Sequence, residues 1–223
     1  PDDSGGMGWG YSGQGMTYYP EGDPGGSLDG FGGSLFIVGH DQEMFVAEVS
    51  IPLPVISQNL EDLNTAQTLQ PFADITGGYI TQGLDIPIMG IEYLPECNDL
   101  KEETLQFTAG QHFQGFEASH GSAFIDLGES NTLGLWHFDG FTNYTTNDYL
   151  FSIPEDWALE NVNGYPLASG RFREGVWGGL GPTLFAYSPC MGADSLEPGG
   201  IISDIQPLLL YGCLLYTSDA ADE

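Results

Sequence analysis

The density of glycine and proline restricts this chain more than any other feature of its sequence. It contains 33 glycines and 14 prolines, which separate short apolar runs. Both residues interrupt helices and favour turns, and the runs between them are rich in β-branched and aromatic residues, a composition typical of strands. Clear examples are residues 34–40, 44–52, 122–128 and 148–154. We therefore predict an all-β fold, with one helical turn expected within residues 57–69.

An internal repeat predicts how these strands are organised. Four segments begin with glycine and contain an aromatic residue near their end: GMTYYP at Gly15, GIEYLP at Gly90, GLWHFD at Gly134 and GPTLFAYSP at Gly181. A period of about 40 to 50 residues with three or four strands per unit is typical of a β-propeller. We therefore predict an incomplete β-propeller, with about four blades of antiparallel strands, in residues 1–212.

The repeat also predicts the strands of each blade. The first blade takes residues 15–20, 34–40, 44–52 and a fourth strand near 69–76, the second takes 88–94, 105–112 and 122–128, and the third takes 134–139, 148–154 and 167–173. The fourth blade opens at Pro182. An incomplete propeller leaves an edge strand and a blade face exposed, which favours aggregation.

The segment 213–223, CLLYTSDAADE, matches the in-frame translation of a transposase adapter used in sequencing libraries. It is treated as a processing scar and not as part of the fold. We therefore expect the native part of the sequence to end at Gly212, so that the propeller-like domain of residues 1–212 is truncated at its C-terminus.

The charge balance excludes several classes of partner. The chain has 3 Lys and Arg residues against 32 Asp and Glu residues, a formal net charge of -29. Such a surface repels phosphate backbones and anionic lipid, so nucleic-acid binding is not expected. No apolar run approaches the roughly 20 residues that span a bilayer, so no membrane span is predicted. Apolar residues make up 41% of the chain, which indicates a folded domain.

Two regions carry a resemblance to a known group of proteins. They are GMTYYP followed by SLFIVGHDQEMFVAEVSIP, and the region from ASHGSAFIDL through DYLFSIPEDW to LASGRFREGVWGGLGPTLFAYSP. These segments resemble environmental bacterial proteins that look like secreted β-propellers, distantly similar to the phytase-like esterase and NHL-type propellers. The resemblance implies the fold and a secreted or periplasmic location, but no activity. The acidic metal-ligand pattern expected of lactonase or phytase propellers is missing.

Histidines are the first candidates for chemistry. In a propeller, the loops between the second and third strands of each blade emerge on one face, where ligands usually bind. His40, His112 and His120 are all predicted in such loops. Histidine can exchange protons or bind metal near neutral pH, so His40 or His112 could act as a general base or a metal ligand, with Asp41 orienting it. The alternative is that each histidine is a turn residue bonded to its own loop.

The two arginines suggest an anion site. Arg171 and Arg173 are two positions apart in a predicted strand, so their side chains would project together. A guanidinium pair can bind a carboxylate, sulfate or phosphate. Trp177 follows in a glycine-rich turn and is the best candidate for an exposed sugar-stacking ring. The competing interpretation is that both arginines pair with nearby carboxylates and hold the blades together.

Cation and thiol chemistry are only weakly indicated. The loop at residues 23–33 has two aspartates among glycines, which could bind Ca²⁺, but the spacing does not match an EF-hand and also fits an ordinary hairpin. No metal site is otherwise predicted. Cys97 and Cys190 could form a disulfide or remain as two buried thiols, and the sequence leaves both possibilities open.

Three functions are compatible with these features. The first is binding of an anionic or sugar-like small molecule or glycan on the loop face, through Arg171, Arg173, Trp177 and the histidines. The second is a structural or adhesion scaffold without chemistry. The third is a hydrolase acting on esters, lactones or glycosides at the same face. The sequence ranks binding first, the scaffold second and the enzyme third.

Overall fold

The computed structural model describes residues 8–26, 30–80, 87–96, 102–111, 118–129, 132–141, 146–171, 183–189 and 199–210. Within them the chain forms mostly β-strands, and every pairing between named strands is antiparallel except one. The all-β prediction is confirmed. No helix in this part of the chain is long and apolar enough to cross a membrane.

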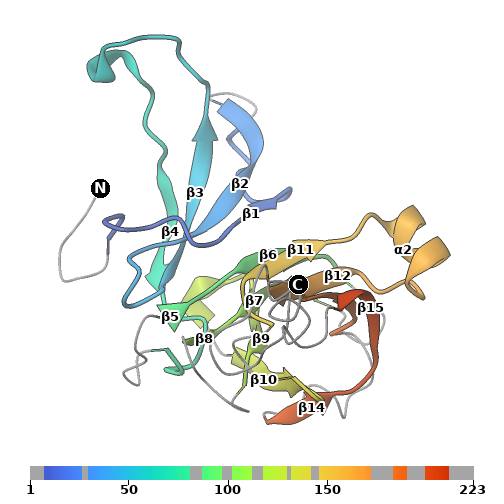
Figure 1. Ribbon diagram of the computed structural model, residues 1–223. Helices are drawn as coiled ribbons and strands as arrows, with labels where there is room; N and C mark the ends of the chain where they lie inside the picture. Colours follow the sequence, from blue (N-terminus) through green and yellow to red (C-terminus); the bar gives the residue numbers. More distant parts are fainter. Residues whose placement is uncertain are drawn as a thin grey trace, which may run out of the picture.

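The first sheet has the strand order β1-β2-β3-β4. It contains β1 (Met16–Tyr19), β2 (Gly30–Val38), β3 (Val46–Pro52) and β4 (Thr68–Ala73). Each strand lies within or close to one predicted for the first blade. The long connection from β3 to β4 projects away from the sheet (Figure 1) and contains a single 3-10 turn, η1 (Leu60–Asp62), where a helical turn was predicted. Asn59 caps this turn by accepting a hydrogen bond from the Glu61 backbone N–H.

The second sheet has the order β6-β7-β9-β10-β14. Its members are β6 (Ile91–Leu94), β7 (Thr104–Thr108), β9 (His120–Phe124), β10 (Thr132–Phe138) and β14 (Gly200–Ile202), and β14 runs parallel to β10. A 3-10 turn, η2 (Leu127–Glu129), precedes β10. Two short strands, β5 (Pro87–Ile88) and β8 (Gly110–Gln111), pair with each other beside this sheet.

The third sheet has the order β11-β12-β13-β15. Its members are β11 (Tyr149–Ser152), β12 (Leu167–Arg171), β13 (Thr183–Tyr187) and β15 (Ile205–Leu210). A short helix that the sequence analysis missed, α2 (Glu155–Asn161), connects β11 to β12. It starts with two acidic residues after Pro154, which suits a helix N-terminus. It ends before Asn163 and Gly164, which both have positive φ angles.

The predicted assignment of strands to the third and fourth blades is wrong. The strand at Gly134 was expected to open a third blade, but it is the fourth strand of the second sheet, and Gly134 pairs with Ser122 of β9. The strand expected to open a fourth blade is β13, the third strand of the third sheet. A glycine followed by aromatics suits any packed strand, so the pattern does not identify its place in a sheet. The described residues form three large sheets and not four units.

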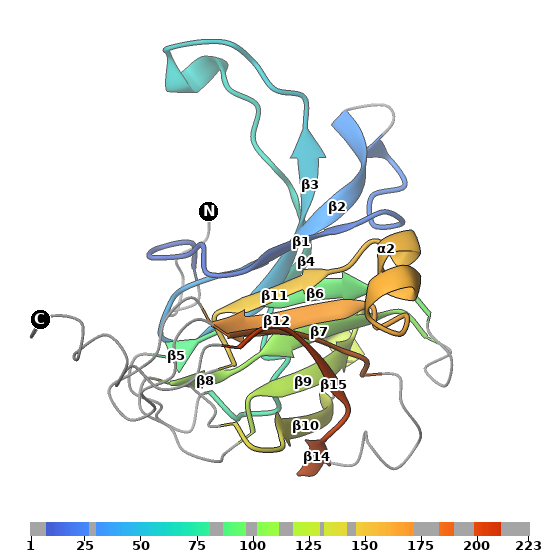
Figure 2. The same cartoon turned by 45° about the vertical axis from the view of Figure 1, so that its right-hand side comes forward.

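The first strands of the three sheets lie next to one another (Figures 1 and 2). Gly15 packs so closely on β6 that a Cβ there would lie 2.9 Å from the Ile91 backbone N, which explains the glycine that leads β1. A Cβ on Gly90 would lie 3.6 Å from the Leu150 Cβ of β11. Thr17 contacts Tyr93, and Glu92 contacts Ser152, so residue numbers rise together along all three strands. The inner strands β1, β6 and β11 therefore run in the same direction.

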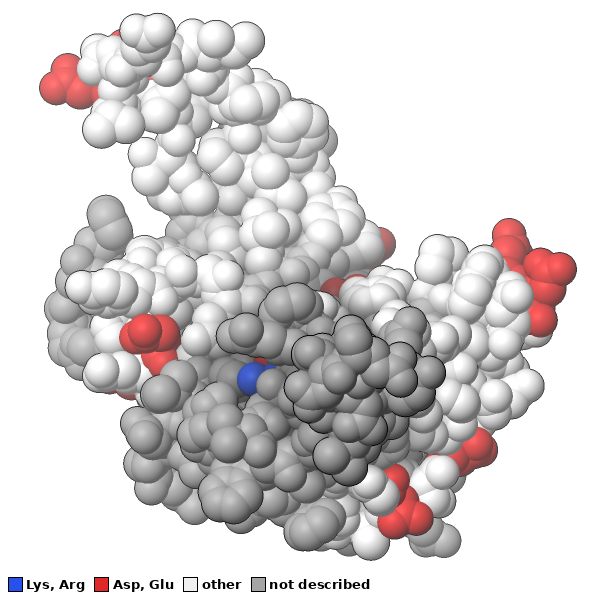
Figure 3. All heavy atoms as spheres, viewed as in Figure 1, with Lys and Arg blue, Asp and Glu red and all other residues white. Residues whose placement is uncertain are grey.

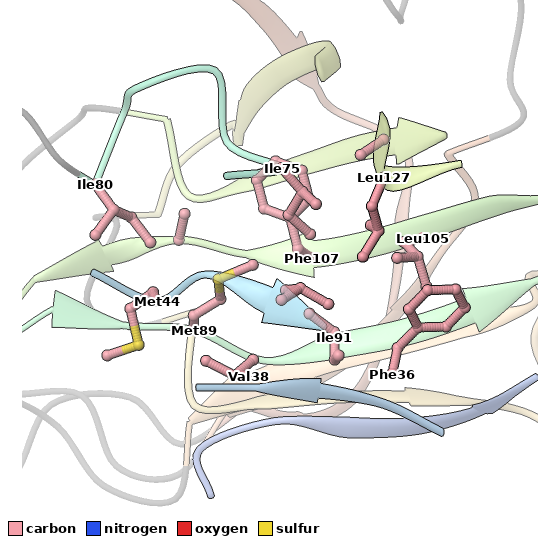
Figure 4. Close-up of a cluster of buried hydrophobic side chains, with 13 residues drawn as sticks. Phe36, Val38, Met44, Ile75, Ile80, Met89, Ile91, Leu105, Phe107 and Leu127 are labelled. Carbon is pink, nitrogen blue, oxygen red and sulfur yellow. The ribbon is translucent and has the colours of Figure 1, made fainter. Parts of the chain in front are cut away.

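Hydrophobic side chains fill the spaces between the sheets. The first cluster joins sheets one and two and is shown in Figure 4, with Phe36 and Val38 of β2 packed against Ile91, Leu105 and Phe107. The second cluster joins sheets two and three. It consists of Leu94, Trp136, Phe138, Leu167, Phe185, Tyr187 and Ile202. A third cluster packs α2 and the turn after it against Ala168 and Ala186 of the third sheet. Face-to-face burial therefore positions the three sheets around their inner strands.

Candidate functional site

The strand directions place several predicted residues at one end of the molecule. The second strand of each sheet is antiparallel to its inner strand, so β2, β7 and β12 all end on the same side. His40 follows β2, and Arg171 is the last residue of β12. His112, Arg173 and Trp177 lie outside the described residues. We refer to this end as the loop face.

His40 is held by its own loop. Its Nδ1 lies 3.3 Å from Asp41 Oδ1, 3.2 Å from Glu43 Oε2 and 3.2 Å from the Gln42 backbone N. Its ring meets Tyr11 edge to face. An Nδ1 that accepts from the Gln42 N–H is unprotonated, whereas one that donates to the carboxylates is protonated. The loop therefore offers partners to both forms of His40, and Asp41 lies beside it as the hydrolase hypothesis requires.

His120 does not lie in a loop, and that part of the prediction is wrong. It is the first residue of β9, where it pairs with Thr108 and Trp136, and it is fully buried. The residues Ser, His and Gly read as a turn, but here they enter a central strand. The ring lies between the second and third sheets and meets Phe138 and Tyr187 edge to face.

A buried chain of hydrogen bonds fixes the His120 tautomer. Nε2 lies 2.6 Å from Ser169 Oγ, and Nδ1 lies 2.8 Å from Ser119 Oγ. Ser169 Oγ donates to the backbone carbonyls of Thr146 and Tyr149, at 2.7 and 3.0 Å. Since its single proton is used there, Nε2–H must donate to Ser169 and Nδ1 must accept from Ser119. Burial lowers the pKa of His120 to about 3, so the ring is neutral and bridges the two sheets.

Arg171 is paired with a carboxylate. Its Nε lies 3.1 Å from Asp148 Oδ2, and only 11% of its side chain is exposed. Asp148 directly precedes β11, and Tyr149 pairs with Gly170, so the two residues face each other across neighbouring strands. Arg171 is the only Lys or Arg among the described residues, so the blue atoms in Figure 3 belong to it. This geometry supports the structural interpretation of Arg171, within one sheet and not between two.

Replacing Arg171 with methionine is expected to lower the free energy of unfolding by about 1 to 3 kcal/mol, because Asp148 would keep its charge in a partly buried place without this partner. Urea unfolding of Arg171→Met, Asp148→Asn and the double variant measures the coupling. Single variants that each unfold like the parent protein would show that the pair contributes nothing.

A second location, at the opposite end of the inner strands, is a cleft of about 790 Å³. All three inner strands contribute to it, through Tyr18 of β1, Glu92 and Tyr93 of β6 and Ser152 of β11, and Glu155 of α2 closes one side. The molecular surface is indented between the first sheet and α2 (Figure 3). We refer to this site as the axial cleft. Its volume lies within the range of small-molecule sites.

Glu92 connects the three strands beside the axial cleft. Its carboxylate accepts from Thr17 Oγ1 at 3.3 Å and from the Ser152 backbone N–H at 3.1 Å. Thr17 Oγ1 in turn accepts from the Tyr93 N–H at 2.9 Å. The sequence analysis missed Glu92, although a charged residue inside the apolar segment GIEYLP is a signal that could have identified it.

Three tyrosines are held in fixed positions, and Tyr18 and Tyr93 among them line the cleft. Tyr18 donates its hydroxyl to the Gly32 carbonyl at 3.0 Å while 49% of the residue stays exposed. Tyr19 and Tyr93 both donate to Glu103, at 3.0 and 2.5 Å. Burial, followed by the Glu103 hydrogen bond and charge, raises the pKa of Tyr19 to about 12 and also raises that of Tyr93. Both phenols are therefore neutral donors near pH 7.

The described residues test the calcium prediction only at Asp23 and do not test the thiol prediction. Among these residues, no group of three or more His, Cys, Asp or Glu side chains could hold a metal ion. In the loop suggested for Ca²⁺, Asp23 Oδ1 accepts from the Gly25 N–H at 2.9 Å, which is an ordinary turn contact. Cys97 and Cys190 lie outside the described residues.

Comparisons with known proteins do not assign the chain to a family. No family model matches it, and no curated protein or solved structure matches it either. The arrangement itself defines the class of protein as an all-β protein of antiparallel sheets around three aligned inner strands. Function must be inferred from the site geometry.

Proposed function

We propose that this protein is a secreted or periplasmic binding module of the β-propeller type, and that it binds a sugar-like ligand in the axial cleft. The proposal is supported by three consecutive sheets, each built mainly as an antiparallel meander and each starting with an inner strand, which is the arrangement expected of consecutive propeller blades. Ligands of closed sheets and propellers commonly bind near the axis, and the axial cleft lies at the ends of the inner strands.

The observation that carries the proposal is the mixture of groups in the axial cleft. The Tyr18 ring is half-exposed and held rigidly, which suits stacking on the apolar face of a sugar. Carboxylates from Glu92 and Glu155 accept hydrogen bonds from hydroxyl groups, and the Ser152 hydroxyl can donate or accept. An aromatic platform combined with polar groups of this kind is suited to a hydroxyl-rich ligand.

The proposal moves the ligand site predicted from the sequence. The earlier site was the loop face with Arg171, Arg173, Trp177 and the histidines. Arg171 pairs with Asp148, and His120 lies between two sheets, so neither is arranged for a ligand. The support that Arg171 gave to an anionic ligand is therefore weakened, whereas Arg173 and Trp177 lie outside the described residues and stay predictions. The axial cleft supports a sugar-like ligand independently of them.

Replacing Tyr18 with alanine is expected to weaken oligosaccharide binding about tenfold, about 1.4 kcal/mol, because the stacking surface is lost. Calorimetric titration with a panel of neutral oligosaccharides measures this loss. Tyr11→Ala is the matched control, since Tyr11 is 82% exposed and does not line the axial cleft. Equal weakening by both variants, or no binding by the parent protein, would overturn the proposal.

A scaffold without a ligand is the second candidate. Its specific support is that Arg171, His120 and His40 all contact groups of the protein itself. The same titrations distinguish the two functions, because a scaffold shows no saturable binding to any oligosaccharide. Hydrolysis stays a prediction, to be tested by turnover of esters, lactones and glycosides.

A further inference from the structure

We infer that the axial cleft selects ligands by charge and binds cationic, amino-bearing sugars in preference to neutral or anionic ones. This inference rests on the proposed function, because it concerns the ligand class of the same cleft.

The cleft contributes several carboxylates and, among its described lining residues, no Lys, Arg or His. Glu92 belongs to β6, Glu96 follows the end of this strand, and Glu155 lies in the first turn of α2. They therefore surround the ligand space from two elements that the fold brings together. An ammonium group placed among them is attracted, whereas a uronate carboxylate is repelled.

The three carboxylates differ in their contacts within the protein. Glu92 accepts hydrogen bonds from Thr17 and Ser152 and holds the inner strands together. Glu96 and Glu155 are exposed residues on the rim of the cleft. An ammonium group can therefore bind to the rim without breaking the contacts of Glu92, and rim residues can be changed without disturbing the strands.

The apolar part of the site explains why a sugar, and not a bare cation, is the expected ligand. Tyr18 and Met16 lie on the same side of β1 and are about half exposed at the cleft. The ring stacks on the sugar while the amino group meets the rim carboxylates. Stacking on the ring and pairing of the ammonium group with a carboxylate are each weak at an exposed site. An amino sugar is the ligand that makes both interactions at once.

The test compares three tetrasaccharides at pH 6 and low ionic strength: oligoglucosamine as the cation, oligo-N-acetylglucosamine as the neutral ligand and oligogalacturonate as the anion. We expect the cationic ligand to bind at least tenfold more tightly than the neutral one and the anionic ligand not to bind. The preference is expected to shrink at 0.5 M salt because rim charges are screened.

The double variant Glu96→Gln/Glu155→Gln is expected to remove most of the preference. Neutral binding is expected to change much less, because the amide oxygen of glutamine still accepts a hydrogen bond from a sugar hydroxyl. Its matched control is Glu61→Gln/Asp62→Asn, which makes the same change in net charge on the distant η1 turn. An equal effect of both double variants would show that the preference for the cationic ligand comes from the overall negative charge of the protein and not from the cleft. That outcome would overturn the inference.

The remaining outcomes separate the two proposals. If cationic and neutral ligands bind equally, or if the anion binds best, the charge inference fails and the sugar-binding proposal stands. If no tetrasaccharide binds, both fail. Binding of glucosamine oligomers that is unaffected by Tyr18→Ala would place the ligand outside the axial cleft and overturn both.

Discussion

Replacing His120 with alanine is expected to destabilise the protein by about 3 kcal/mol or more, the largest loss for any of the predicted site residues. The substitution leaves a cavity between two sheets and removes the hydrogen-bond partner of Ser119 and Ser169, which are both buried. Urea unfolding followed by tryptophan fluorescence measures this loss, with His40→Ala on the loop as the matched control. Similar losses for the two variants would contradict the role given to His120.

His120 also predicts a pH dependence. In the folded protein, burial lowers the pKa of His120 to about 3, below the ordinary value of 6.5. The unfolded chain therefore binds this proton more readily than the folded protein does. The stability contributed by the neutral ring is therefore complete above pH 6.5 and is lost as pH falls towards 3. Between pH 7.5 and 5 the loss is expected to be about 2 kcal/mol.

Because many carboxylates also titrate at low pH, the test is a difference between variants. The unfolding free energy of His120→Gln is expected to fall by about 2 kcal/mol less than that of the parent protein over this interval. Parallel pH profiles for the parent and His120→Gln would show that the buried ring does not titrate on unfolding.

The first sheet could be predicted from the sequence because its strands are long and are bounded by glycine and proline. Residues 34–40 and 44–52 are such runs, and they correspond to β2 and β3. The later sheets could not be divided correctly, because β10 and β13 carry the same glycine and aromatic pattern as an inner strand. The true counterpart of β1 and β6 is β11, whose segment YLFSIP keeps the final proline but lacks the leading glycine.

The candidate site was harder to predict than the fold, because side-chain partners depend on sheet packing. His120 is buried because the third sheet packs against it and places Ser169 in contact with its ring. The residues next to His120 in the sequence, ASHG, do not indicate this contact. The pairing of Arg171 with Asp148 depends on the register of β11 and β12. The axial cleft requires three inner strands that are far apart in the chain, so only the placement of all three sheets could identify it.

Gly170 shows how closely these contacts depend on one strand, and Gly170→Ala is expected to cost about 3 kcal/mol or to prevent folding. A Cβ at this position would lie 2.1 Å from the Thr183 carbonyl oxygen and 2.9 Å from the Leu184 Cα, both on the backbone of β13. The Asp148 N–H donates to the Gly170 carbonyl at 3.0 Å, so β12 is also held from the other side and cannot shift freely.

Such a displacement would disturb two contacts at once, because Gly170 lies between Ser169, the partner of His120, and Arg171, the partner of Asp148. Urea unfolding, together with the soluble yield, measures the effect. Gly32→Ala is the matched control, since a Cβ on Gly32 meets nothing within 4 Å. If Gly170→Ala is as stable as Gly32→Ala, β12 and β13 can separate enough to accept a methyl group. The contact of Ser169 with His120 and the contact of Arg171 with Asp148 are then independent of each other. If Gly170→Ala is strongly destabilised and also loses the pH slope attributed to His120, the strand joins both contacts into one unit.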